Sequence, residues 1–149
     1  MDEFDRSILR HLQLDASLTV EQVADRVSLS RNACWRRIKQ LEDKGILRGR
    51  VALVDGDAVD LGLTVLMLVR TSEHDDVWAE AFRKAVHAFP EVTGAYRMSG
   101  DLDYVLRVRV RDVKAYDAFY QKLTRKLKLA DISASFVMEE IKDTTALPV

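Results

Sequence analysis

Between residues 31 and 40 the sequence carries a group of side chains that can bind nucleic acid. Arginine can donate two hydrogen bonds to guanine, asparagine can pair with adenine, and lysine can contact phosphate. The polar side chains of this segment that share such capacity are Arg31, Asn32, Arg36, Lys39 and Gln40. Residues 30–50 carry seven Lys and Arg against two Asp and Glu, although the whole chain has a formal net charge of -1. A local basic patch of this kind is typical of a nucleic-acid contact surface.

The same pattern also has a simpler interpretation, because the charged face of a helix is often only solvated. Two uncharged neighbours need separate interpretations. Trp35 lies at the edge of the polar face, and we expect it to pack against a neighbouring helix, with contact to a sugar-phosphate backbone as the alternative. Cys34 lies on the apolar side, where we expect a small buried hydrophobe and not a thiol sensor.

Three short helices would position these side chains. Apolar spacing predicts helices over residues 3–14, 20–27 and 31–44, and Asp2, Thr19 and Ser30 precede them as capping residues. Gly45 follows the third helix, as glycine commonly does at a helix end. A short helix, a tight turn and a longer helix form the helix-turn-helix pattern.

After Gly45 the pattern changes. Residues 46–54 are rich in β-forming side chains, which favours a strand, and residues 55–62 form a turn-rich acidic linker. The sequence therefore predicts two domains, 1–62 and 63–149.

The second domain alternates between strand and helix patterns. Strands are predicted over 63–71, 91–98, 104–110 and 132–141, and helices over 77–89 and 113–127. This order, βαββαβ, is that of a ferredoxin-like layer of two helices on an antiparallel sheet. The whole chain is therefore predicted to be an α+β protein, with a winged-helix-like helix-turn-helix domain before the ferredoxin-like domain.

One strand of this sheet carries a row of arginines, Arg107, Arg109 and Arg111, opposite its apolar side. We expect an ordinary cross-strand charge ladder, with Glu139 as one available acid; an anion site and contact with a partner subunit are the alternatives. Because the helices cover only one face of such a sheet, we expect the other face to be covered in a homo-oligomer.

Several classes of protein are disfavoured by what the sequence lacks. The segment 1–13 is acidic where a signal peptide is basic, and the longest apolar run is too short to span a bilayer, so we expect a cytoplasmic protein. With Cys34 as the only cysteine we expect no disulfide, no metal site and no cofactor. The second domain shows no catalytic triad, paired carboxylates or glycine-rich phosphate loop, so we expect no enzyme.

Four stretches carry a more specific signal: FDRSILRHLQLDASLT, SRNACWRRIKQLEDKGIL, GDLDY and SASFVMEEIKDTTALP. In this order they resemble the Lrp/AsnC (feast/famine) family of transcription regulators over essentially the whole chain. The resemblance implies an N-terminal DNA-binding domain, a hinge strand over residues 46–54 and a C-terminal domain that forms dimers, often assembled into octamers. It also implies an amino-acid effector bound between dimers.

The resemblance also implies effector-contact residues. They are Met98, Ser99, Gly100, Asp101, Leu102, Asp103 and Tyr104, with Thr144 and Thr145 near the same interface. Where many relatives have a proline-containing turn before the third helix, this sequence has SRNACWRR. The DNA bases that it prefers can therefore differ from those that these relatives prefer. The favoured hypothesis is an amino-acid-responsive regulator that binds double-stranded DNA. An architectural DNA-binding protein without effector control and a small-molecule carrier or enzyme are the alternatives.

Overall fold

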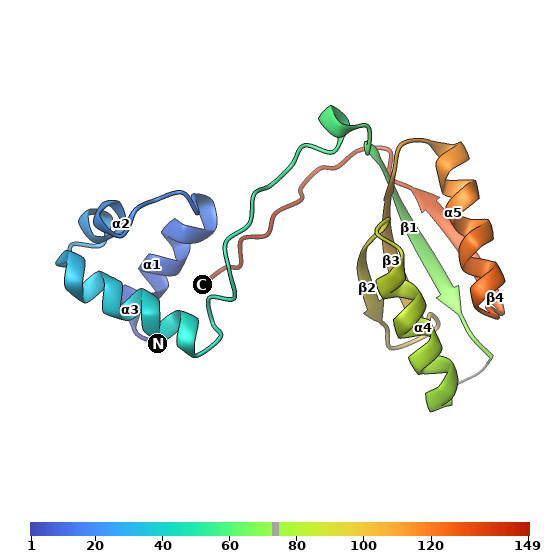
Figure 1. Ribbon diagram of the computed structural model, residues 1–149, viewed down its shortest axis with the longest axis horizontal. Coiled ribbons are helices and arrows are strands. Elements are labelled where there is room, and N and C mark those ends of the chain that lie inside the picture. The colour runs from blue at the N-terminus through green and yellow to red at the C-terminus, as the bar shows by residue number, and fades with distance from the viewer. Residues whose placement is uncertain (73–74) are drawn as a thin grey trace. The chain divides into compact units, whose positions relative to one another are not determined.

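The structure, a computed structural model, describes residues 1–72 and 75–149. The chain forms two compact units (Figure 1). Unit 1 comprises Met1–Leu53 together with Ile141–Val149, and unit 2 comprises Val54–Glu140. The sequence pattern places a single division after residue 62, whereas the chain leaves unit 1 at Leu53 and contributes to it again from Ile141.

Unit 1 is built on three helices, α1 (Glu3–Leu14), α2 (Val20–Arg26) and α3 (Arg31–Asp43). The predicted capping residues hold the first turn of each. The Asp5 N–H donates to the Asp2 carboxylate at 2.9 Å, and the Thr19 and Ser30 hydroxyls each accept a backbone N–H at 3.2 Å. These bonds satisfy donors that a helix start leaves without partners. The predicted helix-turn-helix is confirmed.

The core of unit 1 fixes the orientation of α3. Its apolar stripe, Cys34, Ile38 and Leu41, is buried at 4% exposure or less against residues of α1 and α2 such as Ile8 and Val23. The helix ends before Gly45, whose φ of 68° lies in the left-handed region that glycine adopts without steric cost. Burial of this stripe leaves the opposite side of α3 facing water.

Residues 46–54 form no strand, contrary to the prediction. A strand is stabilised by backbone hydrogen bonds to a neighbouring strand, and within the described residues the segment pairs with none. Its apolar side chains Val51, Leu53 and Val54 are at least 69% exposed. High β-propensity is therefore not sufficient here, because propensity reflects a fit to a sheet surface that this segment does not join.

Unit 2 is a four-stranded antiparallel sheet with two helices, as predicted. Its elements are β1 (Leu63–Arg70), α4 (Asp76–Ala88), β2 (Val92–Arg97), β3 (Tyr104–Val110), α5 (Val113–Lys126) and β4 (Asp131–Phe136), preceded by the short helix η1 (Asp57–Val59). The strand order is β2-β3-β1-β4, so β2 and β4 are the edges. The last strand ends at Phe136, earlier than predicted.

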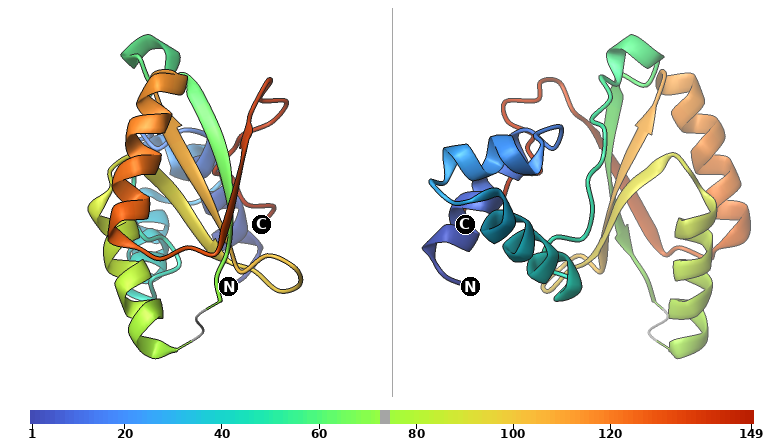
Figure 2. Two further views of the ribbon diagram at one scale, coloured as in Figure 1. Left: turned by 90° about the vertical axis from the view of Figure 1, so that its right-hand side faces the viewer. Right: turned by 60° about the vertical axis from the view of Figure 1, so that its left-hand side comes forward.

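Both helices of unit 2 cover the same face of the sheet (Figure 2). The core lies between these layers and includes the fully buried Met67, Leu106 and Phe119. Alternation along β3 directs Leu106, Val108 and Val110 toward the helices, as the sequence predicts. Among the described residues of unit 2, no helix lies on the other face.

The arginine row on that face is held by neighbours within the same unit. The Arg109 guanidinium pairs with Glu140 at 2.7 Å, and Arg107 donates to the Thr93 hydroxyl at 3.2 Å. Glu140, in the segment after β4, also accepts from the Thr64 hydroxyl at 2.9 Å. Arg109 therefore pairs with Glu140 and not Glu139, and Arg111 pairs with the adjacent Asp112 at 3.2 Å.

The segment Ile141–Val149 completes unit 1. The Gln13 amide at the end of α1 forms two hydrogen bonds with the backbone of Leu147, accepting its N–H at 2.7 Å and donating to its carbonyl at 3.2 Å. Val149 packs against the core of unit 1. The helical unit thus contains a strap, residues 141–149, that the chain supplies only after unit 2.

Candidate nucleic-acid interface and ligand pocket

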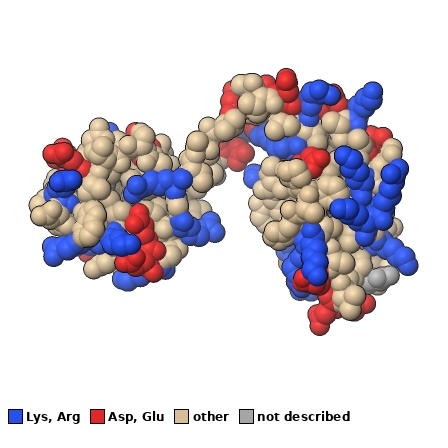
Figure 3. Space-filling view, in the orientation of Figure 1, with Lys and Arg blue, Asp and Glu red and all other residues tan. Residues whose placement is uncertain are grey.

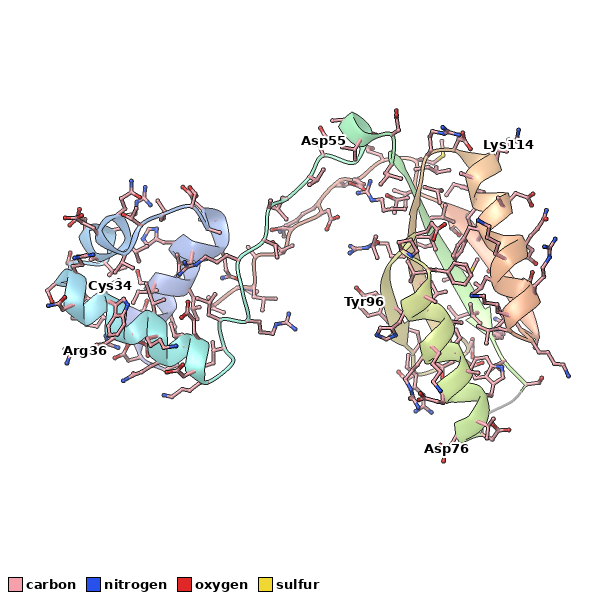
Figure 4. The ribbon with its side chains drawn as sticks, in the orientation of Figure 1. Cys34, Arg36, Asp55, Asp76, Tyr96 and Lys114 are labelled. Atoms are coloured by element: carbon pink, nitrogen blue, oxygen red, sulfur yellow. The ribbon has the colours of Figure 1, made fainter. Side chains whose placement is uncertain are left out.

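The outward side of α3 gathers the polar residues that the sequence singles out. Arg31, Asn32, Arg36, Lys39 and Gln40 are all exposed. They lie on the helix that follows the turn of the helix-turn-helix, the position from which such helices contact base edges in the major groove. Figure 4 shows Arg36 projecting outward from α3.

The basic residues on the outward side of α3 differ in whether an acidic side chain already binds them. Within the described chain, Arg31 and Arg36 form no ion pair or side-chain hydrogen bond, so both are free to bind an anion. Lys39 pairs with Asp43 one turn further along at 2.9 Å, and this hydrogen bond raises the pKa of Lys39. Both groups of that pair are more than half exposed, so water and salt weaken the pair and Lys39 can exchange Asp43 for another anion.

Arg37 belongs to the same basic segment but has a structural role. Its guanidinium pairs with Asp2 at 2.8 Å and with Asp5 at 2.7 Å, and it lies 5.4 Å from the centre of the Phe4 ring. The hydrogen bonds to these two carboxylates raise the pKa of Arg37. Arg37 therefore joins α3 to the start of α1, and the sequence-based count of basic residues overstates the charge available to a ligand. Lys and Arg side chains on this unit are interspersed with acidic ones (Figure 3).

The two uncharged residues of this segment have opposite environments. Cys34 is fully buried, and burial raises the pKa of its thiol, so the interpretation as a small hydrophobe is confirmed. Trp35 is 56% exposed, so the prediction that it packs against a neighbouring helix is wrong. Cys34, Ile38 and Leu41 form the buried side of α3, and Trp35 lies beside this apolar stripe on the helix surface.

In unit 2 the expected effector-contact residues form the turn between β2 and β3. Met98, Ser99, Gly100 and Asp101 are exposed. The Met98 N–H donates to the Asp103 carbonyl at 2.8 Å, which closes the turn, and Gly100 has a φ of 102° that favours glycine. A Cβ atom at Gly100 would meet no described atom within 4 Å, so the tip of the turn is open at this position.

Asp103 has a structural role that the sequence does not reveal. Its carboxylate accepts the backbone N–H of Thr71 at 2.8 Å, just after β1. Its own N–H donates to the Val69 carbonyl at 3.1 Å. Asp103 thereby fixes the β2–β3 turn to the end of β1.

A cavity of about 370 Å³ lies next to this turn, between α4 and the strands β2 and β3. Phe82, Val86 and Ala95 provide apolar surface in its lining, and the rings of Phe82 and Tyr104 pack with their centres 4.3 Å apart. Asp103 and Tyr104 belong both to the turn and to the cavity. The cavity therefore contains two of the expected residues and extends away from the others.

Charges of both signs line this cavity. The acids are Asp75, Asp76 and Asp103, and the bases are Arg83, His87 and Arg97. Most have partners: Asp75 caps α4, Arg83 pairs with Glu80 at 3.2 Å, and His87 Nδ1 lies 2.8 Å from the Arg83 carbonyl. Within the described residues, Asp76 and Arg97 form no ion pair or side-chain hydrogen bond. They are available to a ligand that carries both charges. Figure 4 labels Asp76 on α4 and Tyr96 on β2, which also lines the cavity.

The ligand site predicted from the sequence includes no residue of α4. Asp76, Ala79, Arg83 and His87 recur at intervals of three and four residues, so they share one side of the helix. This row of small and charged residues beside the buried side of α4 is the sequence feature from which these cavity residues could have been predicted. Thr144 and Thr145 lie in the strap of unit 1, so the single chain does not place them in the same compact unit as the turn.

Sequence comparisons match both units to known families. Residues 1–48 match a winged helix-turn-helix DNA-binding domain, and residues 64–147 match the Lrp/AsnC ligand binding domain. The chain is 45% identical over 150 residues to the DNA-binding transcriptional activator DecR of Escherichia coli strain K12, covering 100% of this chain and 99% of that protein. Among the described residues, no helix is long and apolar enough to cross a membrane.

Solved structures agree with the fold. An AsnC family transcriptional regulator from Agrobacterium tumefaciens is 49% identical with a TM-score of 0.97, over 99% of this chain and 97% of that one. A transcriptional regulator from Neisseria meningitidis, solved as a complex with L-Met, is 38% identical with a TM-score of 0.94, over 99% of this chain and 96% of that one.

Proposed function

Because the chain belongs to the Lrp/AsnC family of transcriptional regulators, we propose that it binds specific double-stranded DNA through α3 and that an amino-acid effector controls this binding or the assembly of the protein. The observation that carries the first part is the outward side of α3, where free arginines and an amide lie on a helix held by a buried stripe. A protein with this role acts in the cytoplasm, where the DNA of a bacterium or archaeon lies.

In this proposal α3 enters the major groove. Arg36, at the centre of the exposed side, reads guanine, and Asn32, one turn earlier, reads adenine. Arg31 and Lys39 neutralise phosphates, and Gln40 contacts a base edge or the backbone. Phosphate contacts supply affinity for any sequence, and base contacts discriminate between sequences.

The proposed reader is a homodimer, which can assemble further to an octamer. A two-fold dimer presents two copies of α3 to two half-sites about 10 bp apart, or a multiple of that distance. The sheet face of unit 2 that carries no helix among the described residues is the surface proposed for this association, because Leu66, an apolar residue on that face, is 37% exposed.

The proposed effector is a free amino acid bound in the cavity of unit 2. Arg97 is suited to the α-carboxylate and Asp76 to the α-amino group, while the surface around Phe82 and Val86 accepts an apolar side chain. The remaining turn residues Met98, Ser99, Gly100, Asp101 and Leu102, with Thr144 and Thr145, are proposed to complete the site in the oligomer. The L-Met complex of the Neisseria protein makes L-Met the first ligand to test.

The proposal is tested by two measurements on the full-length protein. The first is selection of duplexes from a random-sequence pool at low salt, where we expect enrichment of a two-fold symmetric sequence. The second is a thermal-shift screen of the twenty amino acids, since a ligand of the folded state raises its melting temperature. A failure to enrich any sequence contradicts specific binding. Enrichment that no amino acid changes favours an architectural DNA-binding protein without effector control.

A further inference from the structure

The two tryptophans of the chain lie in contrasting environments. Trp78 on α4 is 6% exposed, stacks on Phe82 at 5.1 Å and donates its indole N–H to the Lys128 carbonyl at 3.0 Å. Trp35 on α3 is 56% exposed and, within the described residues, has no ring contact or side-chain hydrogen bond. Tryptophan is enriched at surfaces that bind other molecules, because its ring combines a large apolar area with a polar N–H group.

Helix geometry places Trp35 among the residues of the proposed DNA surface. Side chains three and four residues apart are neighbours on a helix. The neighbours of Trp35 on its exposed side are therefore Arg31, Asn32 and Lys39, all exposed. The indole is an apolar plate within a polar, largely basic surface.

The major groove of DNA offers few apolar groups that could pack against an indole ring. Base edges there present hydrogen-bond donors and acceptors, with one apolar exception, the C5-methyl group of thymine. We propose that the Trp35 indole packs against thymine methyl groups beside the bases that Arg36 and Asn32 contact, and so makes the protein prefer thymine at those positions. This inference rests on the proposed DNA binding by α3.

The surroundings of Trp35 favour DNA over a second copy of the chain. Two copies joined through this surface would bring Arg31 and Arg36 of each against the same basic residues of the other, and within the described chain neither arginine has an acidic partner to offset the repulsion. A polyanion meets the same arginines favourably.

The test compares thymine with uracil, which lacks only the methyl group. A duplex selected by the wild-type protein is prepared with thymine or with deoxyuridine at each adenine-paired position. We expect the uracil duplex to bind about four-fold more weakly for each contacted methyl, which is the loss expected for one buried methyl-sized group. We expect Trp35→Ala to bind the thymine duplex about tenfold more weakly and to lose its discrimination between the two duplexes.

Equal affinity of the wild-type protein for both duplexes overturns the inference but leaves the proposed function intact. The absence of any selected duplex contradicts the proposed function itself. Because the wild-type comparison needs no variant, the test holds even if Trp35→Ala folds poorly.

A fluorescence experiment provides the second measurement. In a Trp78→Phe background Trp35 is the only tryptophan, and acrylamide should quench its selectively excited emission strongly in the free protein and weakly in the complex with the selected duplex. Weak quenching in the free oligomer would mean that a neighbouring copy covers Trp35, and strong quenching in the complex would mean that DNA does not. Either result contradicts the inference.

Discussion

The proposed DNA surface of unit 1 and the cavity of unit 2 are built in opposite ways. On α3 a single helix supplies all the polar residues, and burial of one side leaves the other free. The cavity takes its lining from a helix and two strands that the sheet brings together. The first site is therefore open and set by helical periodicity, whereas the second depends on tertiary packing. A change in one should leave the other largely unaffected, and the following predictions test this separation.

The largest effect is expected from filling the cavity. Ala95→Trp places an indole in the lining at β2 and should weaken binding of the amino acid identified by thermal shift by about 100-fold or more, since the ligand loses its space. DNA binding by the unliganded protein should stay within a few fold. Calorimetric titration measures the first quantity and fluorescence anisotropy on the selected duplex the second.

Gly100→Trp is the companion variant, which separates the contribution of the turn from that of the cavity. It introduces the same side chain at the exposed tip of the turn, where nothing lies within 4 Å in the single chain. If Gly100→Trp abolishes ligand binding and Ala95→Trp does not, the turn and its neighbour in the oligomer form the site, and the cavity does not.

The next largest effect is expected on DNA affinity. Arg36→Ala should weaken binding to the selected duplex by about 1 to 3 kcal/mol and relax the base preference at the position it contacts. Lys39→Ala should weaken binding to selected and random duplexes alike, because a phosphate contact carries no sequence information. Anisotropy titrations on both duplexes separate these outcomes, and an unchanged affinity for both variants would show that α3 does not enter the groove.

A smaller effect is expected on the stability of unit 2. Asp103→Ala removes the acceptor of the Thr71 N–H and should lower the free energy of unfolding of unit 2 by about 1 to 3 kcal/mol. Asp101→Ala, at an exposed position in the same turn, should change it by less than about 0.5 kcal/mol. Urea denaturation measures both. Equal effects would show that the Asp103 carboxylate does not fix the turn.

The smallest effect concerns pH. The Asp5 N–H, with a further contribution from Arg37, lowers the pKa of Asp2 below its usual 3.8. A carboxyl whose pKa is lowered by folding stabilises the folded state above its unfolded pKa, and this contribution is lost as pH falls through the lowered value. The melting temperature of unit 1 should therefore fall below about pH 4, and this part of the fall should be absent in Asp2→Asn. Circular dichroism at several pH values measures the difference, and identical pH profiles would contradict the assignment.

The sequence predicts local features well because they depend on near neighbours. The caps at Asp2, Thr19 and Ser30 and the two sides of α3 follow from spacings of three and four residues, and the structure has them all. The order of elements in unit 2 also follows from such patterns, because each strand and helix has its own period.

The features that the sequence did not predict depend on distant partners. The exposure of Trp35 depends on whether another helix reaches it, and the failure of residues 46–54 to form a strand depends on the absence of a neighbouring strand. The role of Asp103 depends on Thr71, which is 32 residues away. The cavity combines positions on α4 with positions on β2, a pairing that no local pattern contains.

The strap has a consequence for the order in which the protein is made. The Gln13 amide and the core of unit 1 receive Leu147 and Val149 only after the whole of unit 2 has been translated. At about 5–20 residues per second, the ribosome needs several seconds to add that stretch. During this interval α1, α2 and α3 exist without their last packing partner, while unit 2 is free to fold first. The segment made first is thus completed last, so a nascent chain carries the helix-turn-helix before it carries the residues that finish its unit.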